Sequence, residues 1–228
     1  MADEISLAVA SNFTHAIKAI AARFEADTAH KVTLIFGSTG KHYAQIKNGA
    51  PFDVFFSADV ERPKLLEGEG LASPGSRFTY AVGKIVLWSA QQGYVDPEGK
   101  VLQQQSFHHL AIANPKLAPY GKAAQEVLQA YDAWDALQDR IVLGENIEQA
   151  FQFVASGNAE LGFVPYSQIV RPGHPIAGSF WEVPQSLYAP IEQQAVLLKD
   201  SEAARDFLSF VRTNESRTII QGFGYSTP

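Results

Sequence analysis

The sequence contains no cysteine among its 228 residues. A disulfide framework and a thiolate metal site are therefore both excluded. An exported chain without thiols cannot form wrong disulfides, so this absence slightly favours an oxidising compartment.

Long apolar runs are also lacking. The longest, such as Ile85–Trp88, have the length of a strand, far short of the roughly 18 apolar residues typical of a membrane-spanning helix. The first residues, Met1–Ile5, have neither the basic nor the apolar region of a secretory signal. Such a start fits a cytosolic protein or a periplasmic one whose signal has been removed, and we expect the second.

Clustered positive charge is the third absence. The formal net charge is -6, and the 18 Lys and Arg residues are scattered along the chain. Nucleic acids and other large polyanions are bound through clustered cationic side chains, so we expect no nucleic-acid partner. A small anion held by neutral hydrogen-bond donors remains compatible with this composition.

The residues that are present alternate short β-rich runs with amphipathic stretches, which is typical of α/β proteins with parallel sheets. The expected strands are 5–10, 32–36, 53–58, 79–82, 84–89, 109–113, 141–143, 161–164 and 193–198. The expected helices are 13–24, 41–47, 122–131, 148–155, 202–211 and 217–221. Two such series and a C-terminal return predict two lobes, each a mostly parallel sheet flanked by helices.

The lobe boundaries follow from where the chain must cross. We expect residues 1–82 and 192–228 in lobe 1 and residues 83–191 in lobe 2. Two crossings of this kind form a hinge. No linker long enough to separate independent domains is present, so the lobes should be closely coupled.

Ligands of open parallel sheets bind at the carboxyl ends of strands, where the first N–H groups of the next helix lack partners inside that helix. Four strand-to-helix joints offer this arrangement: Ala10–Thr14, Phe36–Gly40, Ala113–Gly121 and Leu143–Ile147. Ordinary helix capping explains any one joint better than ligand binding does. The four together make ligand binding more favoured, although by themselves they indicate no more than an α/β cleft. If the two lobes face each other, two helix N-termini from each could enclose an anion.

The donors at these joints are neutral, which has a consequence for selectivity. Backbone N–H groups, helix-end dipoles and the hydroxyls of Ser11 or Ser38 suit an anion whose oxygens all accept hydrogen bonds. A protonated oxyanion would direct its own O–H at donors. Molybdate, tungstate or sulfate therefore fit better than hydrogen phosphate.

At the same joints the chain resembles the periplasmic molybdate-binding proteins of ABC-type molybdate and tungstate uptake systems, over nearly its whole length. The matching stretches are Val9–Phe13, Gly37–Gly40, Tyr43–Ile46, Asn48–Asp59, Asn114–Pro115, Ala118–Gly121, Ala155–Gly157 and Leu161–Val164. The resemblance implies a two-lobed, type II-like periplasmic-binding-protein fold that closes on its ligand and then docks on a membrane permease. It implies no enzymatic activity and no cofactor, and we expect a monomer.

The resemblance also assigns residues. Asn12 and Ser38 would bind the anion from lobe 1 through side-chain and backbone donors, with Ser11 and Thr39 as neighbours that add donors. Tyr120 and Ile147 would bind it from lobe 2, mainly through backbone N–H groups. The chain departs from the pattern at Pro165, where some members place a ligand-contacting tyrosine; here Tyr166 comes one residue later.

For the other polar side chains, structural roles are favoured over catalytic or metal-binding ones. Asp53 and Asp59 flank one strand and lie too far apart for shared acid/base chemistry, and Asp59 has the position of a helix cap. The six histidines show no metal-ligand spacing.

Three alternative functions stay open: a receptor for sulfate, thiosulfate or another oxyanion, a small phosphate-handling α/β enzyme, and an anion sensor that docks on a regulatory partner.

Overall fold

The computed structural model describes residues 3–228. Met1 and Ala2 lie outside the described residues; they are the first residues of the expected lobe 1 and of the Met1–Ile5 segment. Within the described part the strands form two five-stranded sheets, ordered β2-β1-β3-β10-β4 and β7-β6-β8-β5-β9. The sheets lie in two compact units. The described residues up to Val82 together with Glu192–Pro228 form unit 1, and Gly83–Ile191 form unit 2.

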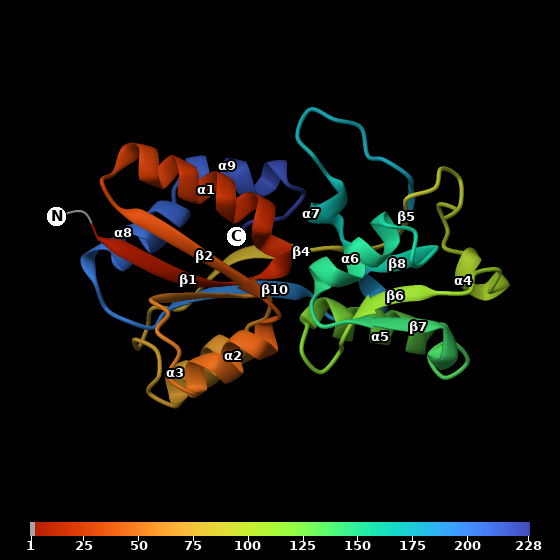
Figure 1. The fold of residues 1–228 in the computed structure, drawn as a ribbon, viewed down its shortest axis with the longest axis horizontal. Helices are drawn as coiled ribbons and strands as arrows, with labels where there is room; N and C mark the ends of the chain where they lie inside the picture. The colour runs from red at the N-terminus through yellow and green to blue at the C-terminus, as the bar shows by residue number, and fades with distance from the viewer. Residues whose placement is uncertain (1–2) are drawn as a thin grey trace. The chain divides into compact units, whose positions relative to one another are not determined.

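Unit 1 contains the first sheet and the helices that cover it (Figure 1). Its strands are β1 (Glu4–Ala10), β2 (Lys31–Gly37), β3 (Val54–Ser57), β4 (Phe78–Gly83) and β10 (Ile191–Leu197). Its helices are η1 (Ser11–Phe13, a short 3-10 helix), α1 (Thr14–Asp27), α2 (Thr39–Lys47), α3 (Glu61–Gly68), α8 (Glu202–Val211) and α9 (Asn214–Gly222). Strands β2, β1 and β3 are parallel, and β10 adds an antiparallel neighbour to β3.

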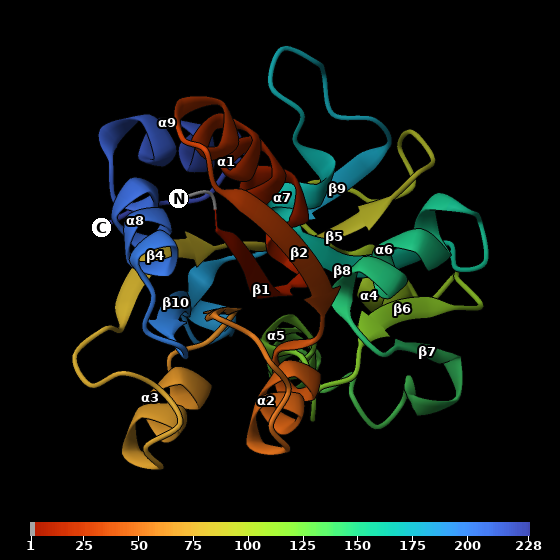
Figure 2. The ribbon, with the colours of Figure 1, turned by 60° about the vertical axis from the view of Figure 1, so that its left-hand side comes forward.

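The apolar side chains of this sheet divide between two faces, because successive residues of a strand point in opposite directions. In β1, Leu7 and Val9 join a core with α1, α8 and α9, while Ala8 joins a second cluster with Ile46 of α2 and Leu66 of α3. Figures 1 and 2 show these two helix layers on opposite faces of the sheet. Burial of each large side chain in such a core stabilises the fold by about 1.5–3 kcal/mol.

Unit 2 repeats this organisation with the second sheet. Its strands are β5 (Ile85–Ser89), β6 (Leu110–Ala113), β7 (Ile141–Gly144), β8 (Leu161–Pro165) and β9 (Ser179–Glu182). Its helices are α4 (Val101–Gln104), α5 (Pro119–Ala130), η2 (Gln138–Arg140), α6 (Ile147–Ala155), α7 (Tyr166–Ile169) and η3 (Gln185–Leu187). Strands β7, β6 and β8 are parallel, and β5 and β9 continue the sheet in antiparallel pairing. Helices α5 and α6 lie on opposite faces of it (Figure 1).

Several expected boundaries were wrong at helix starts. Helix α5 begins at Pro119 and not at Lys122. Proline is favoured at the first helical position because its φ suits a helix and because an N–H there would have no partner inside the helix. Helix α9 begins at Asn214 and not at Arg217, since the Thr213 side chain accepts a hydrogen bond from the N–H of Ser216 and caps the earlier turn. Strand β9 and the short helices α4 and α7 were not expected, and helix α3 was indicated only by the cap position of Asp59.

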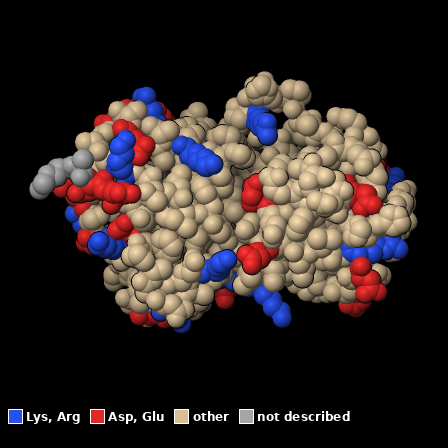
Figure 3. All heavy atoms as spheres, viewed as in Figure 1, with Lys and Arg blue, Asp and Glu red and all other residues tan. Residues whose placement is uncertain are grey.

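On the face shown in Figure 3, acidic and basic side chains are interspersed. This agrees with the scattered charge of the sequence. Among the described residues, no helix combines the length and apolar character needed to cross a bilayer.

Candidate oxyanion site

The two joints of unit 1 are neighbours because β1 and β2 pair in parallel register. Ala10 at the end of β1 lies opposite Gly37 at the end of β2, and paired strands run about 4.8 Å apart. Ser11 and Ser38 each follow directly, and both are buried. The register therefore places two of the expected site residues side by side at one edge of the sheet.

Ser38 is the N-cap of α2. Its backbone is extended, and its Oγ accepts a hydrogen bond from the N–H of Lys41 at 3.3 Å. Thr39 follows as the first helical residue, and its Oγ1 accepts from the N–H of Ala58 at 3.0 Å. The Thr39 hydroxyl thus links α2 to the end of β3, and the helix N-terminus supplies N–H donors beside it.

His42 supports the same joint from inside. Its ring Nε2 lies 3.1 Å from the carbonyl oxygen of Val9, and its Nδ1 lies 3.1 Å from Oε1 of Gln45. Burial lowers the pKa of His42 below its ordinary value, so the ring is neutral at neutral pH. This histidine has a packing role and contributes no positive charge to the joint.

Asn12 is held differently from the expectation. Its side-chain Nδ2 donates to Oε1 of Gln193 at 2.8 Å and to the hydroxyl of Tyr225 at 3.1 Å. An asparagine amide nitrogen carries two hydrogens, so both side-chain donors are already used. The Asn12 side chain is therefore engaged within unit 1, and its expected contact with an anion stays a prediction.

In unit 2, β6 and β7 bring the other two joints together. Ala113 pairs with Gly144 in parallel register. Gly121 lets the first turn of α5 approach the end of β6 closely: a β-carbon at this position would lie 2.2 Å from the carbonyl oxygen of Ala113. Tyr120, the second residue of α5, is only 1% exposed, so its position is fixed by packing.

The joint before α6 has the same design. Asn146 caps the helix by accepting a hydrogen bond from the N–H of Gln149 at 3.0 Å, and Ile147 is the first helical residue. Ile147 is buried, while Glu145, the carboxylate beside the joint, is exposed. The helix N-terminus here also presents neutral donors.

Tyr166 is engaged in packing. Its ring centroid lies 6.0 Å from that of Phe180, and Nζ of Lys84 lies 5.9 Å from its centroid. Lys84 in turn pairs with Glu182 at 2.8 Å. The ring therefore has apolar and cationic neighbours within unit 2.

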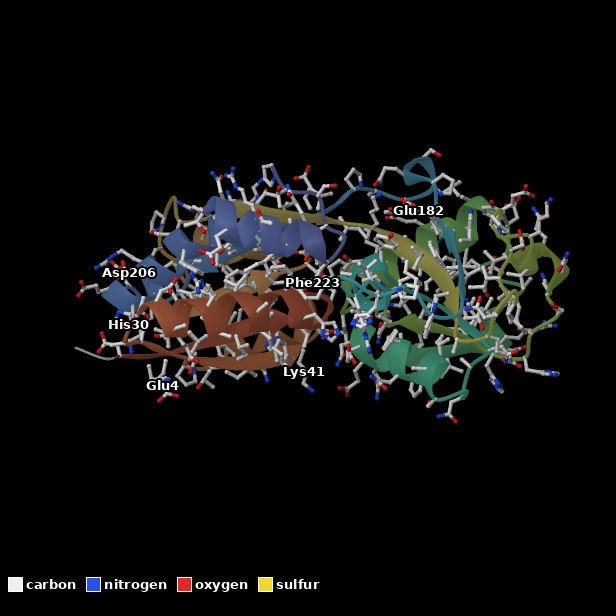
Figure 4. The ribbon with its side chains drawn as sticks, turned by 90° about the horizontal axis from the view of Figure 1, so that it is seen from above. Glu4, His30, Lys41, Glu182, Asp206 and Phe223 are labelled. Carbon is white, nitrogen blue, oxygen red and sulfur yellow. The ribbon has the colours of Figure 1, made fainter. Side chains whose placement is uncertain are left out.

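Lys41 and Asp59 are charged residues near the unit 1 joint in the sequence. Figure 4 shows the exposed Lys41 side chain extending from the first turn of α2. Asp59 accepts from the N–H of Arg62 in the first turn of α3 and forms an ion pair with the Arg62 side chain. Within the described residues no cluster of three or more His, Asp or Glu side chains has the arrangement of a metal site.

A separate cavity of about 520 Å³ lies in unit 2, between β5, α6, α7 and the segment that follows α7. Trp88 and Phe151 stack in its wall with centroids 5.0 Å apart. None of the six expected site residues lines it. The cavity is therefore distinct from the four joints.

Three residues that support the joint containing Asn12 were not predicted from the sequence: Gln193, Tyr225 and Tyr80. Gln193 could have been recognised as a buried polar residue, since it lies on the same inward face of β10 as Ile191 and Ala195. A polar residue at an apolar position of a strand needs a buried partner. Nothing local identified that partner, because Asn12 is 181 residues away along the chain.

Comparison with known proteins identifies the chain at this point. The family model of the bacterial extracellular solute-binding proteins matches residues 5–226. The chain belongs to this family. Among solute-binding relatives, it is 52% identical over 227 residues to the molybdate-binding protein ModA of Azotobacter vinelandii, covering 98% of this chain and 90% of that protein.

A second relative and a solved structure agree. The chain is 51% identical over 229 residues to ModA of Rhodobacter capsulatus, covering 99% of this chain and 89% of the relative. The structure of the Azotobacter vinelandii periplasmic molybdate-binding protein matches with a TM-score of 0.96 and 44% identity, covering 98% and 99% of the two chains. The resemblance and the two-lobed solute-binding fold expected from the sequence are confirmed.

Proposed function

We propose that this solute-binding protein captures molybdate, and tungstate in the same way, and delivers it to an ABC-type membrane permease. The observation that carries the proposal is the paired arrangement of helix N-termini in each unit, built from neutral donors at the carboxyl ends of parallel strands. The two relatives named as molybdate-binding proteins support the choice of anion. The solved relative, named as periplasmic, supports action in the periplasm.

The residues that bind the anion are proposed as follows. In unit 1 the hydroxyls of Ser11 and Ser38 donate, together with the N–H groups that begin η1 and α2, including those of Asn12 and Thr39. In unit 2 the N–H groups of Tyr120 and Ile147 donate. One anion is bound per chain.

Neutral donors explain how the protein would reject hydrogen phosphate. A fully deprotonated tetrahedral dianion accepts hydrogen bonds at every oxygen, whereas the O–H of hydrogen phosphate would face donors and lose a hydrogen bond. Molybdate and tungstate are larger than sulfate, so donors spaced for them leave sulfate with long, weak hydrogen bonds. No turnover is proposed, and the protein acts as a monomer.

The test is thermal unfolding with molybdate, tungstate, sulfate or phosphate at matched ionic strength. A ligand at about a thousandfold excess over Kd stabilises the folded state by about 4 kcal/mol, so molybdate and tungstate should raise the Tm by several degrees. Isothermal titration should then give one site per chain. A rise in Tm with sulfate or phosphate alone would assign a different anion as the ligand. An unchanged Tm with every oxyanion would contradict the binding function.

A further inference from the structure

Asn12 belongs to a buried, uncharged hydrogen-bond network in unit 1. Gln193 Oε1 accepts from Nδ2 of Asn12 and, at 3.0 Å, from the hydroxyl of Tyr80. The hydroxyl of Tyr225 accepts from Nδ2 of Asn12 and donates to the Asn12 carbonyl oxygen at 2.7 Å. All four residues are at most 5% exposed.

The network fixes both the side chain and the backbone of Asn12. A carboxamide whose two hydrogens point at fixed acceptors cannot rotate, and a carbonyl that accepts from a buried hydroxyl cannot turn without losing that bond. Since Asn12 lies in the turn of η1, this also fixes the direction of the N–H groups of the first joint.

The three partners come from segments far from η1 in the sequence. Tyr80 lies in β4, two residues before Val82, and Gln193 lies in β10, directly after Glu192. Tyr225 precedes Ser226, which pairs with Val82 in an isolated bridge. The first joint is therefore tied to both strands through which the chain passes between the units.

Tyr80 keeps the network neutral and intact. A tyrosine hydroxyl is protonated at neutral pH and can donate, and burial raises the pKa of this one further above its ordinary value. The Tyr80 hydroxyl also lies 3.1 Å from the Ser57 carbonyl oxygen of β3, so its one hydrogen is shared between that oxygen and Gln193 Oε1.

We propose that Gln193 and Tyr225 are positioning residues for oxyanion binding, which act by holding Asn12 so that the N–H groups of the first joint face the anion. The proposal rests on the proposed function, because it concerns the affinity of that same site. It assigns the Asn12 side chain to positioning and leaves ligand contact to the backbone.

The test compares molybdate affinity, by isothermal titration, in Tyr225→Phe, Gln193→Leu and the wild-type protein. The matched control is Tyr188→Phe, which removes a buried hydroxyl of unit 2 that accepts from the N–H of Ile85 at 3.5 Å. Urea unfolding gives the stability of each variant, and affinity is measured where every protein is fully folded. Tyr225→Phe and Gln193→Leu should weaken binding about tenfold, whereas the control should change it less than about twofold.

A double-mutant cycle separates positioning from a general structural role. In an Asn12→Ala background, Gln193→Leu should weaken binding little further, because its path to the anion runs through the Asn12 amide. Unchanged affinity in Tyr225→Phe and Gln193→Leu would overturn the proposal, and so would fully additive effects of Asn12→Ala and Gln193→Leu. If Gln193→Leu fails to fold, the gentler Tyr225→Phe decides. Failure of the wild-type protein to bind any oxyanion would overturn the proposed function itself.

Discussion

The ring of His42 occupies the space in front of Gly37: a β-carbon at Gly37 would lie 2.9 Å from Nε2 of His42. The ring cannot move aside freely, because its Nε2 lies 3.1 Å from the carbonyl oxygen of Val9 and its faces and edges pack against the rings of Phe52 and Phe55. The residue before Ser38 is therefore restricted to glycine by packing, and its backbone conformation places no such demand.

Gly37→Ala should destabilise unit 1 by about 1–3 kcal/mol, because the added methyl overpacks a site without free volume. It should also weaken molybdate binding, since any shift of α2 moves the donors at Ser38. Gly68→Ala is the control: no atom lies within 4 Å of a β-carbon there, and the position is helical. Urea unfolding should show a loss for the first variant and none for the second. Equal stabilities would contradict the packing argument.

The pH dependence of stability should carry a contribution from His42. Its pKa is lowered by burial from the ordinary 6.5, so the unfolded chain takes up a proton at a higher pH than the folded protein does. This contribution to stability is complete above about pH 6.5 and is lost as the pH falls through the lowered folded pKa. Urea unfolding between pH 5 and pH 7.5 should give a steeper pH dependence for the wild-type protein than for His42→Gln. Parallel curves would show that the ring is not held neutral.

The parts of this fold that follow local patterns could be predicted from the sequence. Strand alternation located β1 and β2, and helical spacing located the buried face of α1, with Ile17, Ile20 and Phe24 on it. Helix starts were less predictable, because side-chain caps and prolines compete with periodicity, as Pro119 shows for α5.

The candidate site divides in the same way. The joints that contain Ser38 and Ile147 could be located because a strand-to-helix joint is visible in the sequence, whereas the role of Ile147 in binding an anion came from the family resemblance and stays a prediction. The support of Asn12 was not, because it depends on Gln193 and Tyr225, which are 181 and 213 residues away. Which residues meet across such separations is decided by the strand order of the sheet, with β10 inserted between β3 and β4.

The helix-capping role of Ser38 can be separated from its proposed role in ligand binding by comparing it with a second N-cap serine. Ser201 caps α8 in the same geometry: its side chain accepts from Ala204 N at 3.3 Å, as the Ser38 side chain does from Lys41 N. Ser38→Ala and Ser201→Ala should therefore each cost about 1 kcal/mol of stability. Only Ser38→Ala should also weaken molybdate binding, by about tenfold for a lost hydrogen bond to a charged ligand. Equal affinities in the two variants would restrict Ser38 to its capping role.

Lys41 should affect the rate of anion capture more than the final affinity. Its side chain is exposed in the first turn of α2, three residues after Ser38, so its charge attracts an approaching dianion but is screened by salt. Lys41→Gln should slow association on the order of twofold at low ionic strength, and the difference should vanish near 0.5 M salt, where the Debye length is only about 4 Å. Lys47→Gln, at the other end of the same helix, is the control and should leave the rate unchanged. Stopped-flow measurement of tryptophan fluorescence can follow both variants, and a loss that persists at high salt would indicate that Lys41 contacts the bound anion directly.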